Sequence, residues 1–342
     1  MTLPELEAEI TRLGEKSFRA KQIYDWLHKR KVENFDEMTN ISSKMCTVLD
    51  EKLCIKRLKL LKRLESVIDN TVKYLYELPD GGCVESVLME YDYGLSVCLS
   101  TQVGCKMGCR FCASAIAGFV RSLEPSEILQ QYYSICRECS AKGKRVGSIV
   151  LMGIGEPLDN FDNVLKFLGI LSSPEGDGMS LRHVTLSTCG IVPAINKLSR
   201  LHLGLTLSVS LHAADDRARN EIMPVNRTYN ISKLLEACRN YVEVTGRRIT
   251  FEYAVINGKN SNREDALRLS GLLKGINCHV NLIPVNTVKE TGFKSSKKEV
   301  AAFQKILTDN GINATVRRTL GSDINAACGQ LRRTYEASKA SM

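Results

Sequence analysis

Three cysteines in the spacing C-x3-C-x2-C, namely Cys105, Cys109 and Cys112, constrain this chain more than any other feature. They follow an apolar run from Leu95 to Leu99. Thiolates bunched in one loop are typical of iron–sulfur clusters, which are held by cysteine thiolates. A [4Fe–4S] cluster bound by three cysteines keeps one iron open, and an open metal position is what a catalytic site needs to bind a small molecule.

A structural zinc site or a set of buried thiols is the alternative interpretation of the same loop. Structural zinc usually takes four protein ligands, often as paired C-x2-C units. No fourth cysteine or histidine stands beside the loop in the sequence. The spacing therefore favours the cluster.

The composition limits the class of protein. The chain has 342 residues, 13 cysteines and a formal net charge of +9. It contains no apolar run of membrane-spanning length, and Met1 to Glu5 does not resemble a signal peptide, so we expect a cytosolic protein. In the cytosol, cysteines are metal ligands, redox groups or buried side chains. The positive charge favours a polyanionic partner such as a nucleic acid.

We expect four parts along the chain. Residues 1–56 are predicted to form a small helical RNA-docking domain, with one helix starting after Ser17 and another near Ser42. Residues 57–93 are predicted to be an antiparallel β extension, with a hairpin turn at Pro79–Gly82. The main domain is expected at 94–320, followed by a C-terminal tail at 321–342.

Strand-like and helical stretches alternate through the main domain. The expected strands are Leu95–Ser100, Gly147–Met152, His183–Ser187, Leu203–Ser210, Ile249–Ile256, His279–Pro284 and Ala314–Arg318. The expected helices are Ser126–Glu138, Asn160–Leu171, Pro193–Leu198, Ile231–Val244, Arg263–Leu273 and Ser296–Asn310. This alternation predicts an α/β fold with a parallel sheet covered by helices, in six units that form a partial (β/α)6 barrel.

Polar or glycine-rich segments follow most of these strands. Working residues lie at the carboxyl ends of strands in such folds, so these segments are expected to meet at one mouth of the barrel. Gly153-x-Gly155 is not a dinucleotide fingerprint, because a third glycine is missing and Glu156-Pro157 occupies the turn. The segments are the cysteine loop, Gly153–Pro157, Ser187–Gly190, Ser208–His212 and Ile283–Asn286.

These motifs resemble the radical S-adenosylmethionine (SAM) enzymes, in which SAM chelates the open iron. Within that superfamily the chain resembles the RlmN-type adenosine methyltransferases and their Cfr-type relatives. The resemblance covers most of the chain. It is carried by Phe18–Ile23, Val84–Met89, Ser100–Cys105, Leu151–Asn160 and the segment Asp323–Leu331.

The resemblance implies a role for individual residues. Cys105, Cys109 and Cys112 would hold the cluster. SAM would be contacted by Gly155, Glu156, Ser187, Ser210, Leu211, His212 and Asn286. Cys328 would be the cysteine that is methylated, Cys98 the resolving thiol and Glu85 a general base. On the residues alone, Glu85 is equally an exposed strand carboxylate, and His212 a satisfied buried histidine.

The chemistry explains these requirements. An adenine ring C–H carbon is not nucleophilic, whereas the thiolate of Cys328 is and can accept a methyl group from SAM. In the family a second SAM yields a 5′-deoxyadenosyl radical, which takes a hydrogen atom from the methylated cysteine. The resulting carbon radical adds to the adenine, Glu85 removes the ring proton, and a transient Cys98–Cys328 disulfide releases the product.

The family also implies the partners. These are ribosomal RNA near the peptidyl-transferase centre, the anticodon-adjacent adenosine of transfer RNA, and an electron donor such as flavodoxin or ferredoxin. We expect a monomer without membrane contact. RlmN-type enzymes methylate C2 and Cfr-type enzymes C8, and Ser187–Gly190 and Thr250–Tyr253 look more like the C2 group.

Two alternative functions stay open on sequence. One is another radical SAM activity, such as that of a glycyl-radical activase or a sulfur-inserting enzyme. The other is that of a non-catalytic iron–sulfur or zinc protein that binds RNA.

The pair Cys136 and Cys139 lies on one predicted helix face. It is either a second metal or redox site or a pair of buried or surface thiols.

Overall fold

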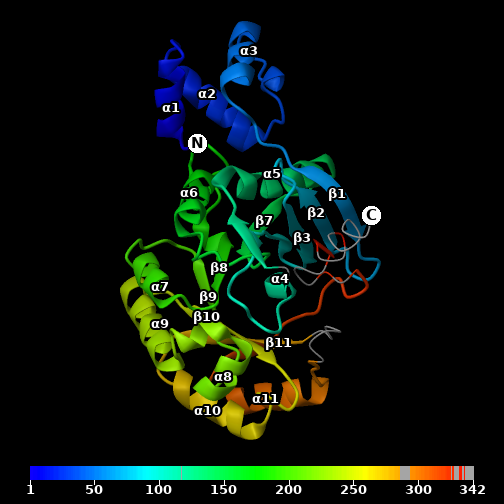
Figure 1. Cartoon of the computed structure of the whole chain (residues 1–342), viewed down its shortest axis with the longest axis vertical. Coiled ribbons are helices and arrows are strands. Elements are labelled where there is room, and N and C mark those ends of the chain that lie inside the picture. Colours follow the sequence, from blue (N-terminus) through cyan, green and yellow to red (C-terminus); the bar gives the residue numbers. More distant parts are fainter. Residues whose placement is uncertain (117, 286–292, 325, 327–330, 333–334, 336–342) are drawn as a thin grey trace.

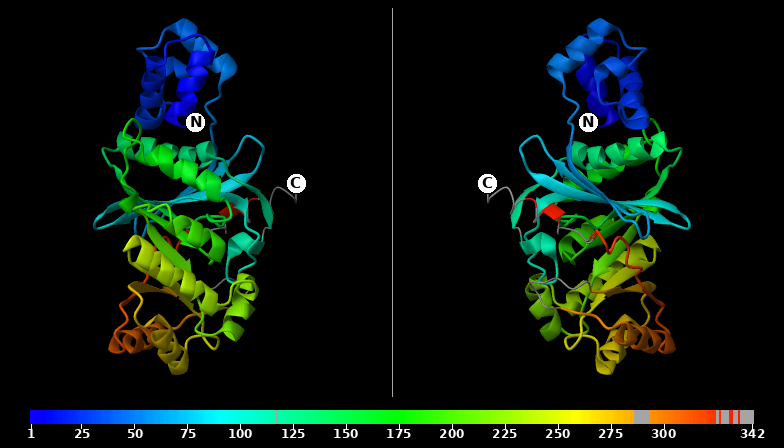
Figure 2. Two further views of the ribbon diagram at one scale, coloured as in Figure 1. Left: turned by 90° about the vertical axis from the view of Figure 1, so that its left-hand side faces the viewer. Right: turned by 90° about the vertical axis from the view of Figure 1, so that its right-hand side faces the viewer.

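The computed structural model describes residues 1–342 except 117, 286–292, 325, 327–330, 333–334 and 336–342. The N-terminal helices form a lobe at one end of the elongated molecule, and the sheet with its covering helices forms the rest (Figures 1 and 2). Within the described ranges, no helix combines the length and apolar character needed to cross a membrane.

The N-terminal lobe is helical, as predicted. It contains α1 (Leu3–Arg12), α2 (Phe18–Tyr24), the π-helical turn η1 (Asp25–Arg30), the 3-10 turn η2 (Phe35–Glu37) and α3 (Ser43–Lys52). The Ser42 hydroxyl caps α3 by accepting the Met45 N–H at 3.3 Å. The expected Ser17 cap is wrong: the Ser17 backbone is already helical (φ −54°, ψ −33°), so its side chain makes no capping hydrogen bond.

A ten-stranded sheet forms the body, in the order β1-β2-β3-β4-β7-β8-β9-β10-β11-β12. The first four strands pair antiparallel, and those from β4 onward pair parallel. The strands are β1 (Lys59–Glu65), β2 (Val72–Glu77), β3 (Cys83–Tyr91), β4 (Gly94–Cys98), β7 (Val146–Leu151), β8 (Val184–Thr188), β9 (Thr206–Ser210), β10 (Ile249–Val255), β11 (Cys278–Pro284) and β12 (Ala314–Val316).

Helices follow the parallel strands, and each crossover between neighbouring strands contains at least one. They are α4 (Ala113–Ile116), α5 (Pro125–Ala141), α6 (Phe161–Ser172), η3 (Leu181–His183), α7 (Val192–Ser199), α8 (Asp216–Ile222), η4 (Pro224–Arg227), α9 (Ile231–Thr245), α10 (Arg263–Leu273) and α11 (Lys297–Asp309). The predicted partial barrel with an antiparallel extension is confirmed: in the described part of the chain, β1 and β12 end the sheet without pairing to each other.

Two short features that support the mouth of the barrel were not predicted from the sequence. One is a two-stranded sheet of β5 (Gln102–Gly104) and β6 (Phe119–Ser122), which flanks the cysteine loop. The other is α8, whose Arg219 is fully buried. Both are too short to show a clear periodicity in the sequence.

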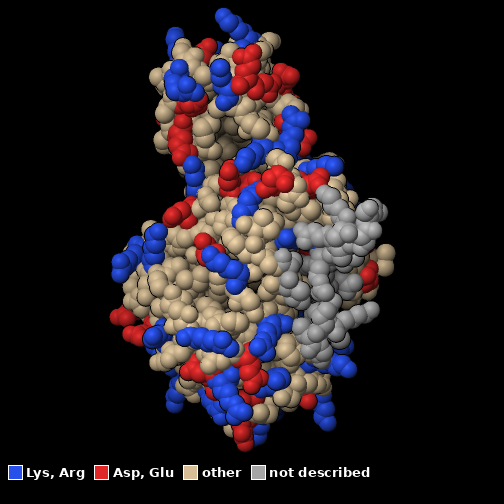
Figure 3. Space-filling view, in the orientation of Figure 1, with Lys and Arg blue, Asp and Glu red and all other residues tan. Residues whose placement is uncertain are grey.

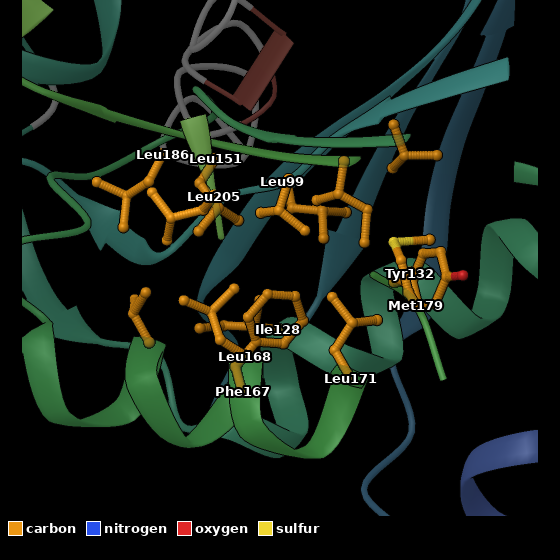
Figure 4. Close-up of a cluster of buried hydrophobic side chains, with 14 of the residues drawn as sticks. Leu99, Ile128, Tyr132, Leu151, Phe167, Leu168, Leu171, Met179, Leu186 and Leu205 are labelled. Carbon is orange, nitrogen blue, oxygen red and sulfur yellow. The ribbon is translucent and has the colours of Figure 1, made fainter. Parts of the chain in front are cut away.

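The main core lies between the sheet and the outer helices. Figure 4 shows leucines of the strand layer facing Ile128 of α5 and Phe167, Leu168 and Leu171 of α6, all of them buried. Cys136 and Cys139 also belong to this core. Both thiols are buried, which favours the interpretation of this pair as core side chains.

Several polar contacts join the N-terminal lobe to the body, and two of them are largely shielded from water. The Lys31 ammonium forms an ion pair with Asp177. His28 Nδ1 and the Tyr133 hydroxyl of α5 lie 2.8 Å apart in a hydrogen bond that is buried. These two contacts hold the lobe to α5 and to the segment that follows α6.

Candidate active site

Backbone hydrogen bonds anchor the cysteine loop to Gly118 and to the end of α8. The Cys105 N–H donates to the Gly118 carbonyl at 3.0 Å, and the Arg110 N–H donates to the Ile222 carbonyl at 2.9 Å. Gly104 has φ +80°, and a Cβ there would lie 1.8 Å from the Gly118 oxygen, so only glycine fits. The backbone thus holds the three cysteines at the mouth, against the loop that follows α8.

The three cysteines lie in one loop at the mouth of the barrel, with Cys105 buried and Cys109 and Cys112 half-buried. In a [4Fe–4S] cluster each such thiolate binds a different iron, so three cysteines leave the fourth iron open. The set of side chains in this loop therefore fits a cluster of this kind.

The electrostatics of the loop also fit a cluster. Burial, and then the negative charges of Cys112 and Glu156, raise the pKa of Cys105 to about 12. Burial likewise raises the pKa of Cys109. A thiolate in this environment needs a positive centre beside it, and coordinated iron supplies one.

Gly155 and Glu156 lie in the turn after β7, and the Glu156 carboxylate binds the backbone at the end of β8. Gly155 has φ +111°, and a Cβ there would lie 2.6 Å from Cβ of Gln102, so the turn leaves room only for glycine. The buried Glu156 carboxylate accepts the Leu158 N–H at 3.0 Å and the Cys189 N–H at 2.7 Å. Burial raises the pKa of Glu156, and these hydrogen bonds oppose the rise.

His212 lies at the end of β9 in a left-handed conformation with φ +56°. Its Nδ1 accepts the Ala254 N–H at 2.9 Å. Burial, and then the charge of Arg219, lower the pKa of His212 to about 3, so the ring is neutral and its proton resides on Nε2. The ring packs edge-on against Phe111 of the cysteine loop at 4.6 Å between centroids. His212 is therefore both a satisfied buried histidine and an Nε2–H donor beside the loop.

Three more of the predicted SAM contacts lie at the same mouth. Ser187 and Ser210 are half-buried at the carboxyl ends of β8 and β9, and Leu211 is buried. Asn286 lies outside the described residues.

Arg219 holds these strand ends together, and the sequence analysis missed it. Its guanidinium donates to the carbonyls of Cys189 at 2.9 Å, Ser210 at 3.0 Å and Leu211 at 3.0 Å. Burial lowers the pKa of Arg219 to about 10. One arginine on a short helix gives no sequence signal for this role, because its partners are backbone atoms of distant strands.

A cavity of about 270 Å³ lies on the inner face of the sheet. Cys98, at the end of β4, is one of its lining residues and is buried. Other residues that line this cavity are Val87 and Met89 of β3, Met152 after β7, Arg317 and Leu320 after β12, and Ala326 of the tail.

Glu85 shares this inner face with Cys98. Val87 pairs directly with Cys98, and Glu85 precedes Val87 by two positions on the same strand. Residues two apart on a strand point to the same side, so the carboxylate and the thiol face the same region. Glu85 is 1% exposed, which excludes the alternative of an exposed strand carboxylate.

Glu85 contacts two groups that the sequence analysis missed. Its Oε2 lies 2.9 Å from Nζ of Lys73 on β2, in an ion pair that is closed to solvent. Its Oε1 accepts the backbone N–H of Arg332 at 2.5 Å. The second contact brings the C-terminal tail onto the inner face.

The start of the tail is anchored to the turn between β1 and β2. Asp323 accepts the Ser66 hydroxyl at 2.7 Å and the Val67 N–H at 3.0 Å. Asp69 of that turn accepts the Gly321 N–H at 2.7 Å. Ala326 then packs in the same apolar cluster as Cys98. Cys328 itself lies outside the described residues.

Two buried histidines predict how stability depends on pH. Burial lowers the pKa of both His28 and His212 to about 3, against 6.5 in the unfolded chain. Below pH 6.5 the unfolded chain binds protons that the folded chain excludes, so stability falls toward pH 3, by about 1.4 kcal/mol per histidine for each pH unit. We expect a lower thermal midpoint at pH 5.5 than at pH 7.5, and a smaller drop in His28→Gln. An unchanged midpoint would contradict the buried neutral histidines.

Comparison with known proteins agrees with this geometry. The model of the ribosomal RNA large subunit methyltransferase N-terminal domain (RlmN_N) matches residues 1–55, and that of the radical SAM superfamily matches residues 99–270. A crystal structure of a radical SAM methyltransferase from Sphaerobacter thermophilus superposes with a TM-score of 0.94 at 39% identity, covering 96% of this chain and 97% of the other. The fold is therefore that of a radical SAM protein.

Similarity to named proteins specifies the family of this chain within the radical SAM superfamily. A protein of Lachnoclostridium phytofermentans is 51% identical over 98% of this chain and 94% of its own length. One of Clostridium perfringens strain SM101 is 51% identical over 99% of this chain and 97% of its own length. Both carry the name "Probable dual-specificity RNA methyltransferase RlmN". The chain belongs to the RlmN family, and membership of the radical SAM superfamily implies a [4Fe–4S] cluster and SAM as its cofactors.

Proposed function

We propose that this chain is a SAM-dependent RNA methyltransferase that methylates C2 of one adenosine in 23S ribosomal RNA and of the anticodon-adjacent adenosine in transfer RNAs. The RlmN relatives, about half identical over nearly the whole chain, support the activity and its two RNA substrates. The single structural observation that carries the proposal is the course of the tail: Ala326 packs beside Cys98, and Arg332 bonds to Glu85.

The cofactor site is assigned to the mouth of the barrel. Cys105, Cys109 and Cys112 hold the cluster. The SAM contacts are Gly155, Glu156, Ser187, Ser210, Leu211, His212 and Asn286. When bound, the cluster and SAM supply one-electron cleavage and a transferable methyl group. The residues of the chain orient these groups: Glu156 and Arg219 fix the strand ends, and the neutral His212 presents an N–H donor.

Cys328 is the methyl carrier in this proposal, and Cys98 and Glu85 complete the reaction. Cys328 follows Ala326 by two residues, which is at most about 7 Å of extended chain. Glu85 removes the proton from the methylated ring carbon, and Cys98 forms a disulfide with Cys328 to release the product. A disulfide in a reducing compartment is transient, so a reductant must regenerate the thiols.

We assign RNA docking to the N-terminal helical domain, residues 1–56. We propose three further parts of the chain, namely the β extension (57–93), the barrel (94–320) and the C-terminal tail (321–342). The match of residues 1–55 to the RlmN N-terminal domain supports the first boundary. Figure 3 shows Lys and Arg mixed with Asp and Glu on the visible face of this lobe, so docking there does not rest on a uniformly basic surface. We further propose a cytoplasmic monomer that receives electrons from a flavodoxin or ferredoxin.

The product nucleoside tests the proposed function. The full chain carrying its cluster is reduced anaerobically and incubated with SAM and 23S ribosomal RNA that lacks the modification. We expect 2-methyladenosine in the digested RNA. The appearance of 8-methyladenosine would place the chain with the Cfr-type enzymes, and RNA without methyladenosine would overturn the proposal.

The anchored tail leads to a separate prediction for Asp323→Asn. The Ser66 hydroxyl and the Val67 N–H donate to different oxygens of the Asp323 carboxylate, and an asparagine has only one oxygen, so the tail loses one of these hydrogen bonds. Methylation of RNA should slow by about fivefold or more, with the iron content unchanged. The control is Asp162→Asn, whose carboxylate is 89% exposed and pairs only with Lys197 among the described contacts. Equal rates for the two variants would contradict the anchoring role.

A further inference from the structure

Lys73 lies in an unusual place for a lysine. Its side chain is 0% exposed, and its Nζ lies 2.9 Å from Oε2 of Glu85, which is 1% exposed. Lys73 pairs with Val87 across β2 and β3, and Val87 in turn pairs with Cys98. The ammonium therefore lies on the inner face of the sheet, together with the thiol and the carboxylate.

Stability does not explain this pair. Removing an ammonium and a carboxylate from water costs several kcal/mol for each ion, and apolar replacements for a buried ion pair are often neutral or stabilising. The neighbouring β2 residues Tyr74 and Tyr76 point to the opposite face, where their hydroxyls bond to α5 residues Glu138 and Ser134. The lysine is thus placed on the one face of β2 that carries the proposed chemistry.

The two oxygens of Glu85 are held by different parts of the chain. Lys73 holds Oε2 from within the sheet, and the Arg332 N–H holds Oε1 from the tail. A carboxylate has four acceptor positions, and these two contacts use one on each oxygen. The orientation of the carboxylate is thereby fixed relative to the tail that carries Cys328.

We propose that Lys73 is a positioning residue for Glu85, which holds the carboxylate in place and balances its charge on the closed inner face. This inference rests on the proposed function. In the proton-transfer step, the C2–H bond of the adenine breaks, its proton passes to a Glu85 oxygen, and its electron pair stays on the ring. Lys73 keeps its three protons throughout.

The rates of two separate steps, methylation of Cys328 and release of the RNA, distinguish a positioning role of Lys73 from a merely structural role. Methylation of Cys328 does not use Glu85, whereas release of the RNA from the methylene link does. In Lys73→Met we expect Cys328 to be methylated as in the wild-type chain, as measured by peptide mass. Formation of methyladenosine should fall by about 10²-fold or more, the usual contribution of an acid–base group, and a protein–RNA adduct should accumulate on denaturing gels.

Matched variants complete the test. Lys73→Arg retains the charge and should recover part of the lost rate, and Lys73→Gln, whose amide still donates to Glu85, replaces Lys73→Met if the latter does not fold. The control Lys59→Met removes a lysine of β1 whose side chain is 74% exposed. Wild-type product formation in Lys73→Met, or equal loss of both steps in every Lys73 variant, would overturn the inference. A wild-type chain without methyl on Cys328 would instead overturn the proposed function.

Discussion

Replacement of Cys98 by alanine is expected to stop the enzyme after one RNA molecule and to leave protein and RNA covalently joined. Cys98 lines the inner cavity beside Ala326, so its thiol is available to the tail. Without that thiol, no disulfide forms to break the bond between Cys328 and the RNA. The adduct should be visible as a slowly migrating band on a denaturing gel, and methyladenosine should not exceed one per chain.

The fold should survive this substitution, because Cys98 lines a cavity and belongs to the small apolar cluster of the inner face, outside the main core. A matched control is Cys54→Ala, which removes an exposed cysteine of the N-terminal region and should turn over normally. Multiple turnovers by Cys98→Ala would show that another group releases the RNA.

The buried ion pair predicts large effects on stability. Lys73→Met or Glu85→Leu alone leaves an uncompensated charge on the closed inner face, at a cost of about 3–5 kcal/mol. The double variant Lys73→Met/Glu85→Leu removes both charges and should be close to the wild type in stability. Thermal unfolding of the cluster-bound chain, followed by circular dichroism, should show midpoints lowered by roughly 4–7 °C in the single variants.

The double variant should recover most of that loss while staying inactive, since it lacks the proposed base. If the two single effects simply added, the charges would not interact, and the account of Glu85 and Lys73 as one unit would fail.

The architecture of the main domain was predictable because its signals are local. The seven parallel strands and the long helices show continuous apolar runs or helical spacing, and each predicted strand overlaps an observed one. The N-cap at Ser17 failed for a physical reason: the preceding turn already places that residue in a helical conformation, which a propensity for caps does not reveal.

The candidate site was predictable only where it is local in sequence. The cysteine loop and the segments after the strands are recognisable by spacing, and the family resemblance added Glu85, Cys98 and Cys328. The supporting groups were missed because they depend on long-range pairing. Lys73 has no sequence feature that marks it as buried, and Asp323 meets Ser66 across 257 positions of chain.

Family membership narrows the remaining alternatives. The RlmN relationship over nearly the whole chain, with the tail lying beside Cys98 and Glu85, favours the methyltransferase over the other radical SAM activities and the non-catalytic RNA-binding protein.

The mass of the tail peptide that contains Cys328 tests the central claim most directly. In protein expressed with its cluster and isolated before contact with substrate RNA, that peptide should be heavier by one methyl group, located on the cysteine sulfur. An active enzyme whose Cys328 is unmodified at every stage of turnover would contradict the claim.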